Sequence, residues 1–418
     1  MLELITTLLV LTAALAYVNV RWIKLPPAIG LLATALVSAL LLKVAALFGL
    51  VDLAPVVRAI EEIDFRDTLL DVMLAPLLFA AALHVDWNAL RSQAVPVLTL
   101  ASAGLVLAAG MLTAALMGVG ALLGFEVPFL WALAFGALIA PTDPIAVGAL
   151  LKKAGVPKEL QMAITGESLF NDGFGVVLFL GVSAAILKGA PPSLGEVGHL
   201  LVFEVAGGLL LGFALGALAV AALRHVDNYQ VEILFTLALV FGGYLLARML
   251  HVSGVLGMVI AGLMLGQQGR SLALSERTQR RLDEFWELVD EFLNAALFVL
   301  IGVEVLVLDM DPRALMLGAA LIPIGLLARF AAVALPLIPL QSRLGWPVGG
   351  FRLLTWAGVR GGISIALALA LPAGPIRSTL LTVAYVIVCF SVLVQGLTME
   401  RVAQSLIGPE GLKAPPAS

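Results

Sequence analysis

Three short polar motifs interrupt long apolar segments, and their residues are the best candidates for chemistry. The first reads Ala-Pro-Thr-Asp-Pro-Ile over residues 140–145, so Asp143 lies between two prolines. Each proline removes an amide donor and disfavours helix in the residue before it, so we predict that a helix breaks here. Broken helices at membrane depth line cavities, and their half-helix ends can face ions. A proline kink capped by Thr142 and Asp143 is the plainer alternative, but a kink does not require an acid.

The second motif, Gly-Glu-Ser-Leu-Phe-Asn-Asp-Gly over residues 166–173, gathers oxygen-bearing side chains. On a helix, Ser168 and Asp172 are four residues apart and share a face, as do Glu167 and Asn171. Carboxylate, amide and hydroxyl oxygens are the ligands that small hard cations prefer. A polar cluster that only holds helices together needs Ser or Asn but not two acids. We therefore predict a cation site here, rather than a haem or zinc site.

The third motif surrounds Arg360 with Gly358, Gly361 and Gly362. The glycines weaken the helix, and an arginine in apolar surroundings needs a carboxylate partner, for which Glu167 is the candidate. Arg329 is the other basic residue deep inside an apolar segment. For Arg329, pairing with a neighbour and extending to the membrane surface both remain open.

The composition identifies the class of protein that must position these motifs. Of the 418 residues, 61% are hydrophobic and 12% are charged, whereas a soluble domain has about 25% charged residues. The apolar residues suffice for about a dozen spans of roughly 20 residues each, which predicts an all-α polytopic membrane protein. A single cysteine excludes a disulfide scaffold, and the net charge of −4 argues against a nucleic-acid partner.

Charge clusters and breaks divide the chain into about thirteen predicted spans. They lie near residues 3–20, 26–50, 68–85, 94–120, 129–150, 161–187, 197–222, 230–250, 252–269, 286–307, 314–340, 351–372 and 376–404. Residues 1–408 thus form one transmembrane unit, and residues 409–418 form a short cytoplasmic tail. The distribution of Lys and Arg favours an N-terminus outside and a C-terminus in the cytoplasm. The interrupted fifth and twelfth spans then run in opposite directions, which is typical of secondary transporters with inverted repeats.

Together, the three motifs resemble the signature segments of the first cation/proton antiporter family. This family contains bacterial sodium/proton antiporters of the NhaP type and eukaryotic sodium/proton exchangers, and the order and spacing match along nearly the whole chain. The resemblance implies thirteen helices in two inverted repeats, with the broken fifth and twelfth helices crossing near the site. It also implies a homodimer. The short loops between the predicted spans favour a bacterial inner membrane as its location. The moving core is expected around residues 94–187 and 314–404, and the dimer scaffold around residues 3–85 and 197–307.

The resemblance also assigns roles to the motif residues. By this likeness Asp172 binds Na⁺ or a proton in turn, and Thr142 and Ser168 help to coordinate the cation. Asp143 and Asn171 order the crossing helices, while Glu167 and Arg360 form a structural ion pair. Relatives with Asp-Asp instead of Asn-Asp are electrogenic, so Asn171 implies electroneutral exchange of one cation for one proton. No cofactor is implied; the ligands are the transported ions and membrane lipid.

One departure concerns ion selectivity. Many bacterial members carry an acid in the third span where this chain has Ala80, and neither Asp71, His84 nor Asp86 obviously replaces it. Exchange of Li⁺ or K⁺ for protons on the same scaffold therefore remains open. An ion channel is disfavoured, because a channel would need repeated rings of ligands along a pore, whereas this sequence shows one compact site. An intramembrane hydrolase is disfavoured because Phe170 stands where a nucleophile elbow needs glycine.

Overall fold

The chain folds into helices in a computed structural model that describes residues 2–61, 72–143, 145–190, 193–269, 276–308, 311–374 and 376–411. Over these residues no strand occurs, which confirms the all-α fold class. Eight of the described helices are long and apolar enough to cross a membrane. Shorter apolar helices accompany them, and the count of thirteen spans stays a prediction.

The elements follow the predicted spans closely. Labels with α mark α-helices, and labels with η mark π-helical segments, except for η6, which is a 3₁₀ helix. In chain order they are α1 (Leu2–Val18), η1 (Asn19–Ile23), α2 (Pro27–Leu47), α3 (Ala54–Glu61), α5 (Leu74–Leu83), α6 (Trp87–Ser92), α7 (Ala94–Thr99), η3 (Leu100–Gly104), α8 (Leu105–Leu122), α9 (Phe129–Ile139), α10 (Ile145–Lys153), α11 (Lys158–Lys188), α12 (Leu194–His199), η4 (Leu200–Val205), α13 (Ala206–Leu223), α14 (Tyr229–Met249), α15 (Gly254–Met264), η5 (Leu265–Gly269), α17 (Glu276–Glu304), α18 (Pro312–Leu337), η6 (Ile338–Leu340), α19 (Gln341–Leu344), α20 (Gly350–Ala357), α21 (Gly362–Leu369), α22 (Arg377–Phe390), η7 (Ser391–Gln395) and α23 (Gly396–Gly411). Part of the predicted third span and the end of the predicted tail lie outside the described residues.

Local sequence explains where several helices begin. The side chains of Asp86, Asn228, Ser253 and Asp311 accept hydrogen bonds from backbone amides in the first turns of α6, α14, α15 and α18. These caps satisfy donors that a helix start leaves free. Ser253 also ends the short turn that separates α14 from α15, where His251 adopts a positive φ of 55°. The predicted division between the eighth and ninth spans is thereby confirmed.

Two helices are interrupted in the middle, as the proline and glycine motifs predict. The first break separates α9 from α10, and the second separates α20 from α21. At the two breaks, the amide of Asp143 donates a 2.7 Å hydrogen bond to the carbonyl of Val359. The two interrupted segments therefore cross at this point. The hydrogen bond between them pairs an amide and a carbonyl that the helix breaks leave without intrahelical partners.

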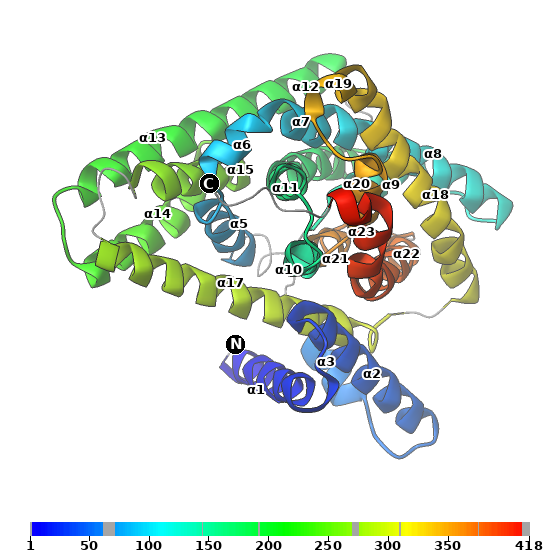
Figure 1. The fold of residues 1–418 in the computed structure, drawn as a ribbon. Coiled ribbons are helices and arrows are strands. Elements are labelled where there is room, and N and C mark those ends of the chain that lie inside the picture. The colour runs from blue at the N-terminus through cyan, green and yellow to red at the C-terminus, as the bar shows by residue number, and fades with distance from the viewer. Residues whose placement is uncertain are drawn as a thin grey trace.

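The long helix α11 lies in the centre of the molecule, with α5, α10 and α20 around it (Figure 1). It packs against α9 and also contacts α10, α15, α20 and α21. Helix α17 runs along one side and packs closely against α2. On another side α18 packs against both α8 and α22. The crossing of the broken helices is thus enclosed by continuous helices, which explains how irregular backbone is kept away from lipid.

Candidate cation site

An unbroken helix presents the second motif to the first break. Glu167, Ser168, Asn171 and Asp172 are all buried on α11. Their spacing places Ser168 and Asp172 on one face of the helix, as predicted. The site is therefore built from a rigid helix facing an irregular backbone segment.

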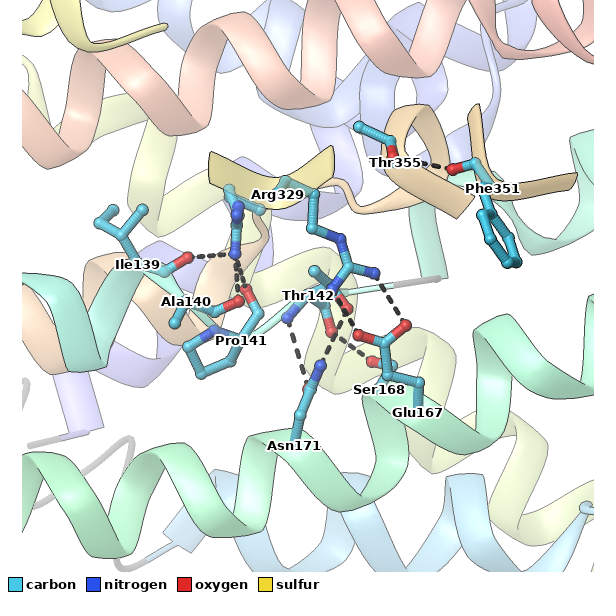
Figure 2. A network of polar contacts seen from close by, with 11 residues as sticks. Ile139, Ala140, Pro141, Thr142, Glu167, Ser168, Asn171, Arg329, Phe351 and Thr355 are labelled. Atoms are coloured by element: carbon cyan, nitrogen blue, oxygen red, sulfur yellow. Dashed lines mark hydrogen bonds and ion pairs between the residues drawn. The ribbon is translucent and has the colours of Figure 1, made fainter. Parts of the chain in front are cut away.

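Thr142, inside the break, is held by two side chains of α11. Ser168 Oγ donates to the carbonyl of Thr142, and Asn171 Nδ2 donates to Thr142 Oγ1 at 3.1 Å. Asn171 Oδ1 in turn accepts from the amide of Thr142 at 3.4 Å. Figure 2 shows Ser168 and Asn171 reaching Thr142 from the same helix. The structure thus brings together the predicted residues Thr142, Ser168 and Asn171.

Asp143 lies where the second broken helix resumes. A Cβ built on Gly361 would overlap the carboxyl group of Asp143, so only glycine leaves room for this acid. Gly361 immediately precedes α21, whose N-terminus carries a partial positive charge. The carboxylate of Asp143 therefore lies at the start of that half-helix. This arrangement suits the predicted ordering role of Asp143 at the crossing.

Asp172 is a buried acid on α11, one turn beyond Ser168, and it is 5% exposed. Asp143 and Glu167 lie close enough to act on it electrostatically. Over the described residues, no three His, Cys, Asp or Glu side chains converge as a group that could hold a metal ion. A carboxylate with a hydroxyl one turn away on the same helix provides hard oxygen donors of the kind that alkali cations prefer.

The predicted ion pair between Glu167 and Arg360 is wrong. Glu167 is bound instead by Arg329 of α18, with Nη1 to Oε1 at 2.5 Å and Nη2 to Oε2 at 2.8 Å (Figure 2). Both side chains are buried. Arg329 reaches Glu167 past Gly358, where a built Cβ would lie 2.6 Å from Arg329 Nε. The third motif therefore contributes Gly358, which leaves space for Arg329, and does not contribute Arg360 as the partner of Glu167.

Arg360 has a different partner, the C-terminal end of α9. Its Nη1 donates to the carbonyls of Ile139 and Ala140, and to that of Pro141 at 3.0 Å. A helix that stops early leaves such carbonyls without donors and carries partial negative charge at its end. Arg360 therefore caps the first half-helix. The proline break itself predicts that need, but sequence analysis assigned the arginine to an acid.

Helix α5, which carries Ala80, contains no acid that could replace the one found at this position in many bacterial members of the family. Ala80 is fully buried, and its carbonyl lies 2.8 Å from His84 Nδ1. His84 Nε2 is 3.9 Å from Asp283 Oδ1, while Asp86 caps α6; Asp71 lies outside the described residues. Asp290 of α17, which no sequence motif singles out, interacts electrostatically with both Asp143 and His84.

Comparison with known proteins identifies the family. Residues 9–405 match the family model described as "Sodium/hydrogen exchanger, transmembrane". The chain is 43% identical to the Na⁺/H⁺ antiporter NhaP of Pseudomonas aeruginosa, over 99% of both chains. It is 34% identical to the Na⁺/H⁺ antiporter NhaH of Halobacillus dabanensis, over 82% of this chain and 84% of the relative.

A solved structure shows the same fold. The structure of the sodium proton antiporter MjNhaP1 from Methanocaldococcus jannaschii at pH 8 superposes with a TM-score of 0.69 at 20% identity. The superposition covers 91% of this chain and 99% of that one. The family is one of transporters, not of enzymes. This chain is an integral membrane protein that belongs to the sodium/hydrogen exchanger family.

Proposed function

We propose that this protein exchanges Na⁺ or Li⁺ for H⁺ across a bacterial inner membrane, with Asp172 binding the cation or the proton in turn. The observation that carries the proposal is the buried carboxyl of Asp172 on α11, one turn from Ser168. Ser168 in turn contacts Thr142 in the broken helix. The relatives named above, which are Na⁺/H⁺ antiporters, support the same conclusion.

The chemistry follows from competition for one group. A carboxylate can bind a proton or coordinate a cation, and each ligand lowers the affinity for the other by linkage. Ser168 lies one turn from Asp172 on α11 and contacts Thr142, so we assign oxygens of both residues to part of the cation's shell. Sodium is the substrate here, not a resident metal.

The fixed charges around the site support an exchange of one cation for one proton. Glu167 is neutralised by Arg329, and Arg360 is stabilised by the carbonyls at the end of α9. Asn171 is a neutral amide bonded to Thr142. Asp172 then carries the charge that changes during transport, so its exchange of H⁺ for Na⁺ moves no net charge.

The proposed transport cycle alternates access to Asp172 from the two sides. The core around residues 94–187 and 314–404 moves against a scaffold around residues 3–85 and 197–307. We place the N-terminus outside and the C-terminus in the cytoplasm, and we propose a homodimer joined through the scaffold.

Proteoliposomes test the proposed function. A pH gradient is imposed, Na⁺, Li⁺ and K⁺ are added separately, and dissipation of the gradient is measured with and without a clamp of the membrane potential. We expect a response to Na⁺ and Li⁺ that the clamp does not change. A response to K⁺ alone would replace the proposal with potassium/proton exchange, and single-channel currents would contradict antiport.

A further inference from the structure

A buried acid outside the candidate cation site lies at the C-terminal end of α17. Glu304 is the last residue of α17 and is 3% exposed. Its Oε2 atom is buried and has no hydrogen-bond partner among the residues that the structure describes. A charged carboxylate left in that state is costly, so its protonation state must matter to the surrounding structure.

Arg377, the first residue of α22, attracts Glu304 electrostatically. Arg377 Nη2 donates instead to the carbonyl of Leu369 at 2.6 Å. Its Nε atom is buried and, within the described part of the chain, has no partner. Two groups of opposite charge thus lie near each other, each with unused bonding capacity.

The position of Leu369 connects this pair to the cation site. Leu369 is the last residue of α21, the half-helix that begins beside Asp143. Arg377 therefore holds one end of a short helix whose other end lies at the crossing.

Other groups fix the same end of α17. Lys43 of α2 donates from Nζ to the carbonyls of Val305 and Leu308, both at 3.0 Å. Tyr385 of α22 donates to the carbonyl of Gly302 at 3.5 Å and also interacts electrostatically with Glu304. The thiol of Cys389 lies beside Tyr385. The end of α17 is thus held between α2 and α22, which the proposed function places in scaffold and core respectively.

We propose that Glu304 and Arg377 form a proton-operated latch between α17 and α22. When Glu304 is protonated, Arg377 stays on the carbonyl of Leu369, as observed. When Glu304 is ionised, Arg377 bonds to it and ties α17 to α22. This latch rests on the proposed function, because it matters for transport only if core and scaffold move against each other. A charge-assisted tie resists that movement, so exchange slows as the pH rises on the side where α17 ends.

Glu304→Gln removes the ionisable group while keeping its shape. Exposed Glu126 provides the matched control, Glu126→Gln. In proteoliposomes of defined orientation, the pH is varied on one side at a time and sodium-dependent exchange is measured. We expect exchange by the parent to fall about tenfold as the pH rises on the side of Glu304, and Glu304→Gln to lose that fall while Glu126→Gln keeps it. A pH profile of Glu304→Gln that overlays the parent on both sides overturns the latch.

A stability measurement tests the latch without transport. Thermal unfolding is recorded for the parent, Glu304→Gln, Arg377→Gln and the double variant, at acid and at alkaline pH. We expect the two changes to be coupled at alkaline pH and additive at acid pH. Additivity at both pH values contradicts the latch. If the parent shows no exchange, the proposed function fails, and this cycle still decides whether the latch exists.

Discussion

Arg329 on α18 and Glu167 on α11 form an ion pair with two hydrogen bonds beside the crossing of the broken helices. Arg360 instead donates hydrogen bonds to carbonyls at the C-terminal end of α9. Each arginine stabilises a different group. One compensates a side chain and the other compensates the carbonyls of an interrupted helix. The charge of Glu167 is therefore balanced by a permanent partner, and neither arginine has to change protonation during transport.

Removing Arg329 should destabilise the protein strongly. Arg329→Met leaves Glu167 buried without its partner, and breaking a buried pair in this way costs about 3–5 kcal/mol. Thermal unfolding in detergent measures the loss. The double variant Arg329→Met with Glu167→Gln should recover a large part of it, because no buried charge remains unpaired. A double variant no more stable than Arg329→Met would show that the pair does not act as a unit.

Arg360 should affect stability through the half-helix α9. Arg360→Ala leaves the carbonyls of Ile139, Ala140 and Pro141 without their donor, at a cost of about 1–3 kcal/mol per unsatisfied group. Arg360→Lys retains a positive donor and should lose less. Equal unfolding temperatures for Arg360→Ala and the parent would contradict this capping role.

Ser168 should contribute to cation affinity. Ser168→Ala removes the hydroxyl next to Asp172 and Thr142, so we expect the sodium concentration for half-maximal exchange to rise about tenfold. Ser183→Ala is the matched control, because Ser183 is also buried on α11 and its Oγ has no hydrogen-bond partner within the described residues. Ser183→Ala should leave that concentration unchanged. Similar shifts for both variants would indicate a general effect of altering α11.

Asn171 should determine the charge that moves with each cycle. Asn171→Asp adds an acid beside Asp172 and replaces the Nδ2 donor to Thr142. We expect exchange by this variant to depend on the membrane potential, whereas exchange by the parent does not. The comparison uses proteoliposomes with and without a potassium and valinomycin clamp. A clamp-independent Asn171→Asp variant would contradict the proposed charge balance.

The sequence predicts the site best where local chemistry decides the outcome. Proline at 141 and the glycines around Arg360 break helices through their own backbone constraints, so both interruptions could be predicted. The shared face of Ser168 and Asp172 follows from helical spacing alone.

The partners of the two arginines could not be predicted in the same way. Whether Arg329 or Arg360 reaches Glu167 depends on how α18 packs beside α20, which no local pattern encodes. The electrostatic interactions of Asp290 with His84 and Asp143 arise from packing too. Such long-range choices depend on tertiary structure.

The most direct test of the account is the number of protons released when purified protein binds Na⁺. Calorimetric titration in two buffers with different protonation enthalpies gives that number. We expect the parent to release about one proton per Na⁺ bound near neutral pH. Asp172→Asn should neither bind Na⁺ nor release a proton, while Asp52→Asn, altered at an exposed aspartate, should behave as the parent. Sodium binding with proton release that persists in Asp172→Asn would contradict the central role of Asp172.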